Sequence, residues 1–250
     1  MKPEVITAII AAIVAVISAV TSIYGQNRIA RLTDQLMKQR EAESREAQTA
    51  ALMSKYRDPL LRSAIDLQSR LYNIHQNRFL ERFYHRSPSA QSYAINNTLY
   101  VVAEYLGWVE ILRREIQFLD LGDLELNRRL SELLVNINQA FAHYKAGGTF
   151  QLHNGEQRAI GEIMTVPRSS SEAIGYDCVG YATFVKKMSD PEFAGWFAKL
   201  RDNIDTMGNA PKVDSERLVL IHSKLIDLID FLDPHHVRVP PKYRTRIEQN

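Results

Sequence analysis

An uninterrupted apolar run from Val5 to Tyr24 constrains this chain more than any other feature of its sequence. The run reads VITAIIAAIVAVISAVTSIY and contains no charge. A helix of about 20 residues rises about 30 Å, which is the thickness of the hydrocarbon core of a bilayer. The few hydroxyl groups can bond back to their own helix, and the Tyr24 ring suits a membrane interface. The sequence therefore predicts a single transmembrane anchor over residues 1–25.

Two other interpretations of the apolar run stay open. A cleaved signal peptide needs a strongly basic start and a shorter apolar core, whereas here Lys2 is offset by Glu4 and the run is long. Cleavage after Ser22 is nevertheless conceivable. A helix buried in a protein core is the other alternative, and it fits less well because no neighbouring segment would cover such a run.

The charges that flank the run predict its direction across the membrane. Lys2 is the one basic side chain before it, and four follow it: Arg28, Arg31, Lys38 and Arg40. Because basic residues stay on the cytoplasmic side, we expect the N-terminus outside and the C-terminal body in the cytoplasm. The four charges either contact anionic lipid or only fix this topology, and we prefer the second interpretation.

Small residues recur every four positions within the run, as Ala8 and Ala12, and again as Ala15 and Ala19. This spacing lets two membrane helices approach closely. The sequence therefore suggests the bilayer as one partner of the chain and a second copy of the chain as another.

Residues 26–57 form a predicted helical stalk that is rich in alanine, glutamate, glutamine and arginine. Ile29, Leu32 and Leu36 follow heptad spacing, but the next seam positions are the polar Gln39 and Glu43. The pattern is therefore shorter than the three to four heptads that indicate a coiled coil. The stalk is expected to form a short coiled coil or to remain a solvated spacer.

The body, residues 58–234, shows helical periodicity and no sustained strand pattern. Asp58-Pro59 and Asp190-Pro191 are typical helix starts, because a capping carboxylate precedes a proline at the first helical position. We expect an all-α fold in which an antiparallel bundle of long helices carries shorter packed helices. The long helices are predicted at 59–84, 90–119, 126–144 and 215–232, the short ones at 153–165, 177–188 and 191–204, and residues 235–250 as an extended basic tail.

Composition excludes several function classes. The chain has 250 residues, 45% of them apolar and 24% charged, which are values typical of globular proteins. A net charge of +2 is too small to suggest a nucleic-acid partner. The one cysteine, Cys178, forms neither an internal disulfide nor a zinc cluster.

No motif for a nucleotide phosphate or an activated nucleophile occurs in the sequence. We expect no cofactor and no metal, because the adjacent His235 and His236 lack companion ligands. The most site-like segment is a polar turn that enters a helix and carries His153, Glu156 and Arg158. It is a weak candidate for binding an anion or another ligand, and a capped helix start explains it more simply.

Two further patterns also have a simple explanation. Asp227, Asp230 and Asp233 lie three residues apart, where they form either a cation site or, as we prefer, a solvated helix face. The aromatic set at 193–197, made by two phenylalanines and Trp196, is more typical of a core than of a ligand pocket.

The sequence thus favours a single-pass membrane protein whose helical body binds a protein partner, senses a ligand or acts as a scaffold without catalysis. The alternative is a membrane effector of the defence or toxin kind, in which clustered transmembrane helices perturb the bilayer. An enzyme whose catalytic residues are dispersed along the chain is a third hypothesis.

Overall fold

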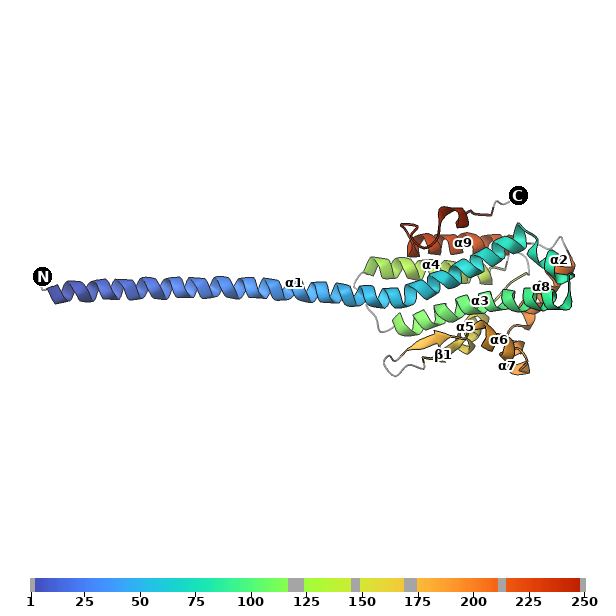
Figure 1. Cartoon of the computed structure of the whole chain (residues 1–250), viewed down its shortest axis with the longest axis horizontal. Coiled ribbons are helices and arrows are strands. Elements are labelled where there is room, and N and C mark those ends of the chain that lie inside the picture. Colours follow the sequence, from blue (N-terminus) through green and yellow to red (C-terminus); the bar gives the residue numbers. More distant parts are fainter. Residues whose placement is uncertain (1–2, 117–123, 145–148, 169–174, 211–214, 248–250) are drawn as a thin grey trace. The chain divides into compact units, whose positions relative to one another are not determined.

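A computed structural model describes residues 3–116, 124–144, 149–168, 175–210 and 215–247. At 3–13, 15–17, 19–20, 45–46, 48–54, 116 and 124 only the backbone is described. The chain divides into two compact units, residues 1–51 and 52–250, and each is considered by itself. The predicted all-α fold is confirmed, since helices make up most of the described chain (Figure 1).

The described part of the first unit belongs to one helix, α1 (Pro3–His75), which also continues through the start of the second unit. Along the described residues no helix has the combination of length and apolar character needed to cross a membrane. Most side chains of the predicted anchor lie outside the described ones, among them those of the four alanines at positions 8, 12, 15 and 19.

The predicted helix start at Asp58-Pro59 is wrong, because both residues lie inside α1. Proline offers no N–H to the carbonyl four residues earlier and normally weakens a helix interior. Here the helix continues because Tyr56, Leu60 and Leu61, on both sides of the proline, are all buried in the body. Packing in the core therefore offsets the missing hydrogen bond.

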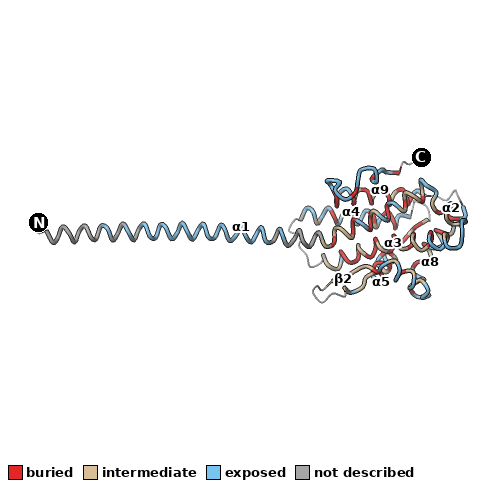
Figure 2. Tube along the Cα trace, in the orientation of Figure 1, coloured by how far each residue is buried: buried red, intermediate tan, exposed pale blue. Residues whose placement is uncertain are grey.

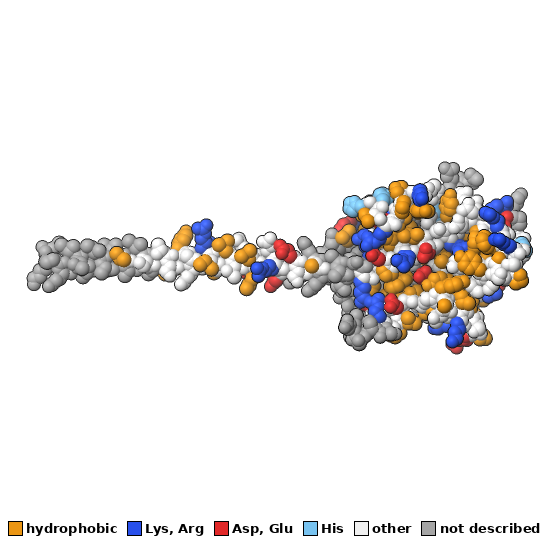
Figure 3. All heavy atoms as spheres, in the orientation of Figure 1, with side chains coloured by type: hydrophobic (Ala, Val, Ile, Leu, Met, Phe, Trp, Pro, Cys, Tyr) orange, Lys and Arg blue, Asp and Glu red, His pale blue; other side chains and the backbone are white. Residues whose placement is uncertain are grey.

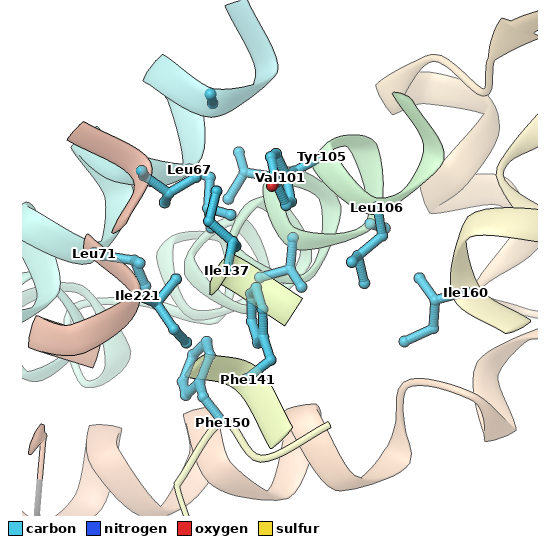
Figure 4. Close-up of a cluster of buried hydrophobic side chains, with 14 of the residues drawn as sticks. Leu67, Leu71, Val101, Tyr105, Leu106, Ile137, Phe141, Phe150, Ile160 and Ile221 are labelled. Carbon is cyan, nitrogen blue, oxygen red and sulfur yellow. The ribbon is translucent and has the colours of Figure 1, made fainter. Parts of the chain in front are cut away.

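The body is built around the C-terminal part of α1. Its buried positions recur every three or four residues, as the sequence periodicity predicts (Figure 2). Their side chains join those of the other long helices in one buried cluster (Figure 4). Leu67 and Leu71 point toward Ile137, Phe141 and Ile221 in this cluster. Burying one such side chain contributes about 1.5–3 kcal/mol, so α1 is a principal source of the stability of the body.

Helices α3 and α4 follow α1 in the bundle, and α3 also packs against α5 while α4 also packs against α9. The short helix α2 contacts both α3 and α8. The remaining elements have these bounds: α2 (Phe79–Tyr84), α3 (Pro88–Ile116), α4 (Leu124–Ala142), α5 (Asn154–Ile163), β1 (Thr165–Pro167), β2 (Tyr176–Cys178), α6 (Tyr181–Lys187), α7 (Pro191–Gly195), α8 (Ala198–Asn209), α9 (Glu216–Leu232) and the 3₁₀ turn η1 (Pro241–Tyr243).

The helix expected over 59–84 is split in two, because α1 ends at His75 and the chain turns before α2. Arg78 lies in this turn with φ 50°, a left-handed conformation that is uncommon for a residue other than glycine. Its guanidinium bonds Glu81 at 3.1 Å. The sequence has no glycine or proline here, so it carries no local signal for this break.

A short antiparallel hairpin replaces a predicted loop and the start of a predicted helix. Thr165 pairs with Cys178 and Pro167 with Tyr176, so residues 176–178 are strand and not helix. Arg168, just after β1, bonds the Asp177 carboxylate at 3.2 Å. Three residues per strand are too few to produce a recognisable alternation in the sequence.

Glycine sets the close contact between α3 and α5. A Cβ atom at Gly161 would lie 2.8 Å from the backbone oxygen of Leu106 and 2.8 Å from Cβ of Glu110. Because one of these neighbours is backbone, the contact cannot be relieved by a rotamer change. The two helices can approach this closely only while residue 161 has no side chain.

We therefore expect Gly161→Ala to lower the free energy of unfolding by about 1–3 kcal/mol, the usual cost of overpacking. The matched control is Gly155→Ala in the same helix, where a Cβ would meet nothing within 4 Å. The control should be neutral or stabilising by up to about 1 kcal/mol. Urea denaturation of both variants measures the difference, and equal stabilities would contradict the close contact.

Candidate functional site

The Asp233 carboxylate organises the C-terminal segment. It is 1% exposed and accepts hydrogen bonds from the backbone N–H groups of Val237, Arg238 and Val239 at 2.9–3.1 Å. It also pairs with the buried Arg244 guanidinium at 2.7 Å. Burial by itself would raise the pKa of this carboxyl, but the three backbone donors and Arg244 outweigh it and lower the pKa.

Asp227 and Asp230 also hold the C-terminal segment and do not form a plain solvated face. Asp230 bonds Arg244 at 2.8 Å, and Asp227 bonds Arg246 at 2.7 Å. Val239 and Ile247 are buried, so the expected extended tail is instead folded over part of the body. The sequence shows the acidic spacing but not the arginine partners, which lie 14 to 19 residues farther along the chain.

We expect Asp233→Asn to destabilise the body by about 3–5 kcal/mol, because Arg244 would then be buried without its principal counter-charge. The control Asp230→Asn removes an exposed contact of the same arginine and should cost less than about 1 kcal/mol. Thermal or urea unfolding at pH 7 compares the two. The difference should shrink as the pH falls through the depressed pKa of Asp233, and equal losses at pH 7 would contradict the assignment.

Two histidines, His75 at the end of α1 and His222 in α9, make polar side-chain contacts. The Gln68 amide nitrogen lies 2.9 Å from Nε2 of His222, which is fully buried. Burial, with Arg246 and His75 adding to it, lowers the pKa of His222 to about 4, so its ring is neutral at pH 7. Since the amide nitrogen donates, Nε2 of this neutral ring accepts.

The second histidine comes nearest to a catalytic arrangement. Nδ1 of His75 lies 2.9 Å from the Ser215 hydroxyl, in a pocket of about 200 Å³ that Arg78 and Glu81 also line. Burial lowers the pKa of His75. A serine–histidine pair normally needs a third group to orient the base, and within the described residues none bonds Nε2 of His75.

A half-buried cluster lies between α3 and β2. The Tyr100 hydroxyl donates to Glu104 at 3.1 Å, and burial raises the pKa of the Glu104 carboxyl. Burial, together with Glu104, raises the pKa of the Cys178 thiol to about 12. Cys178 is thus a poor nucleophile at neutral pH, which agrees with a packing role for this side chain.

The segment with His153, Glu156 and Arg158 forms a capped helix start at α5. The Glu156 carboxylate accepts the backbone N–H of His153 at 2.6 Å and lies 3.7 Å from Nζ of Lys199. Arg158 is engaged elsewhere, with Glu162 at 3.1 Å. The Glu156 carboxylate thus already occupies the start of α5, and the Arg158 side chain pairs away from that position.

Two other sequence candidates are placed as follows. In the aromatic set, Phe193 and Phe197 are buried core residues and Trp196 is 47% exposed. The four basic residues after the apolar run are all exposed, and Lys38 pairs with Asp34 at 2.8 Å. An exposed pair of this kind contributes little stability.

The most ligand-like feature of the body is an apolar groove between α3 and α4, with a volume of about 340 Å³. We call it the α3/α4 groove. Its lining is Val109, Leu112, Arg113, Asn127, Leu130, Ser131, Leu134, Val135 and Asn138. Val135 is 49% exposed, so part of the apolar lining meets water. Figure 3 shows, on the face that it draws, hydrophobic side chains gathered among charged ones over the body.

Two polar atoms give the groove a directional character. The side-chain oxygens of Asn127 and Asn138 are buried and have no hydrogen-bond partner within the described part of the chain. Both residues line the groove from α4. An unpaired buried acceptor costs about 1–3 kcal/mol, so an occupant toward which these amides turn, and which donates hydrogen bonds to them, would recover that energy. Sequence periodicity identified the apolar positions of both helices but not the groove between them.

The described residues hold no cluster of three or more histidine, cysteine, aspartate or glutamate side chains placed to bind a metal. Comparison with protein-family models, with curated proteins and with solved structures finds no match to this chain.

Proposed function

We propose that this chain is a non-enzymatic module, anchored in a membrane, whose helical body binds an apolar segment of a protein partner in the α3/α4 groove. The observation that carries the proposal is the groove itself, with its open apolar lining and the oxygens of Asn127 and Asn138, which have no partner among the described residues. Hydrophobic burial would supply affinity, and the two oxygens would select a segment that offers N–H or O–H donors.

The use of the polar groups in the body supports a binding role over catalysis. Asp233 and Arg244 hold the C-terminal segment, and His222 is buried as a neutral ring. Glu110, with its pKa lowered by Arg113 and Arg114 against the effect of burial, forms a bidentate contact with Arg113 at 2.7 and 2.8 Å. These four groups thus take part in internal contacts of the body.

The anchor is proposed on the sequence run of residues 5–24 and on the unbroken helical backbone of α1. A helix leaves no backbone N–H or C=O unsatisfied in hydrocarbon, which is a requirement for any spanning segment. The basic residues that follow the run orient the proposed anchor with the body in the cytoplasm.

For the anchor, we expect the full chain to float with liposomes and to resist carbonate extraction. Ile13→Arg with Val16→Arg should abolish both properties, because each central charge opposes insertion by about 2.5–3.5 kcal/mol. The control, Asn27→Arg with Gln35→Arg, adds the same charge outside the run and should still float. A wild-type chain that stays in the soluble fraction would disprove the anchor.

For the groove, a photocrosslinking residue at position 135 of the full chain identifies the partner, and binding is then measured with both proteins purified. Val135→Lys should weaken that binding at least about tenfold by placing a charge in the apolar lining. The control is Asn136→Lys on the same helix, an exposed position outside the groove lining. Equal affinity of the two variants would contradict the groove as the binding surface.

The membrane effector remains a second candidate function, supported by the alanine spacing of residues 8–19. Release of a trapped dye from the same liposomes, dependent on the intact apolar run, would favour the effector. If liposomes that carry the inserted chain retain the dye, the result would favour the binding module.

A further inference from the structure

The stalk part of α1 exposes a row of aliphatic side chains. Ile29, Leu32 and Leu36 are 66%, 51% and 56% exposed and lie at three- and four-residue spacing along one face. The opposite face carries the exposed Asp34–Lys38 pair. A helix with one apolar face and one charged face gains stability when the apolar face is covered, at about 25 cal/mol per Å².

This row continues toward the N-terminus at the same heptad spacing. In a left-handed supercoiled pair, which keeps heptad positions on one face, the positions that precede Ile29 follow from the sequence because α1 is unbroken. All of them are small residues: Ala8, Ala11, Ala15, Ser18, Ser22 and Gly25. We call the face from residue 8 to residue 36 the α1 seam.

The residue types on the two faces of α1 change at the same level of the helix. Opposite the α1 seam, the sequence carries isoleucine and valine up to about Ile23 and mostly polar or charged residues from Asn27 onward. On the seam, small residues end at Gly25 and aliphatic residues begin at Ile29. One face thus becomes polar where the other becomes strongly apolar.

This change is what a pair of helices needs when it passes from lipid into water. In lipid no hydrophobic force draws two helices together, and small residues favour association because the backbones can approach closely. In water, large aliphatic side chains drive pairing by burying apolar area. A single lipid-exposed helix has no need for either pattern on one continuous face.

We propose that the α1 seam pairs with the α1 seam of a second copy of this chain in a parallel, two-fold symmetric dimer. The parallel direction rests on the proposed anchor, since two chains inserted in one bilayer with the same orientation present their seams at the same height. In such a pair the small residues of one chain face the small residues of the other, and Leu32 faces Leu32 of the second copy. Such self-complementarity is the property of a two-fold interface.

The sequence also sets the end of the seam. After Leu36 the next positions on this face are Gln39, Glu43 and Glu46. The Gln39 amide donates to Glu43 of its own helix at 3.2 Å. In a parallel pair the two copies of Glu43 would face each other and repel, so the pairing ends near Gln39.

The test is disulfide crosslinking of the full chain in membranes, in a Cys178→Ala background. Leu32→Cys lies on the seam, and the control Asp34→Cys lies two residues away on the opposite face. Oxidation should crosslink Leu32→Cys at least about tenfold faster, because only this position brings the two Cα atoms within the roughly 4.4–6.8 Å that a disulfide spans. Equal rates at both positions, or no crosslinking at position 32, would overturn the proposal.

A second pair of variants separates the dimer from the anchor. Leu36→Glu places like charges on the seam and should reduce crosslinking at position 32 at least about tenfold, whereas Lys38→Glu on the opposite face should not. If flotation fails and the chain is soluble, the same crosslinks are measured in solution. If position 32 still crosslinks faster than position 34 in solution, the dimer is supported and only the anchor is rejected. If the chain floats but position 32 shows no preference, only the dimer is rejected.

Discussion

Burial of one face of α1 between Tyr56 and Ile74 is the interaction on which the body depends. The other long helices bring their apolar faces to this helix, and Figure 4 shows their side chains in the same buried cluster as Leu67 and Leu71. The same burial explains why the helix runs through Pro59, where local signals predict a beginning. A tertiary gain of several kcal/mol exceeds the roughly 3 kcal/mol by which proline weakens a helix interior.

Polar groups inside the body reinforce this packing. Asp233 and Arg244 are both nearly inaccessible to water and satisfy each other, with backbone groups completing their bonds. Breaking a buried pair of this type is costly, because the remaining charge stays buried without its partner. Several other buried polar atoms lack a partner among the described residues, and the amide oxygens of Asn127 and Asn138 in the α3/α4 groove are two of them. These two oxygens differ from the others in lining an apolar groove, which is why they are part of the argument for the proposed binding role.

Helical periodicity in the sequence identified the long helices and most of the core, because repeated burial every three or four residues leaves a clear pattern. The Asp190 cap was also predicted, and its carboxylate accepts the N–H of Glu192 at 3.0 Å. The break at Arg78 and the short hairpin were missed, since tertiary contacts fix them without a local signal. The groove and the carboxylate–arginine contacts were missed for the same reason: their members come from separate segments that only the fold brings together.

The ion pair between Arg238 and Asp58 joins residues 180 positions apart in the chain. The fold thus brings the start of the body and its C-terminal segment side by side. Both side chains are about two-fifths exposed, so the pair adds little stability once made. The pair therefore fixes where the C-terminal segment meets α1 more than it stabilises the body, and without it the buried Asp233–Arg244 contact would still hold that segment.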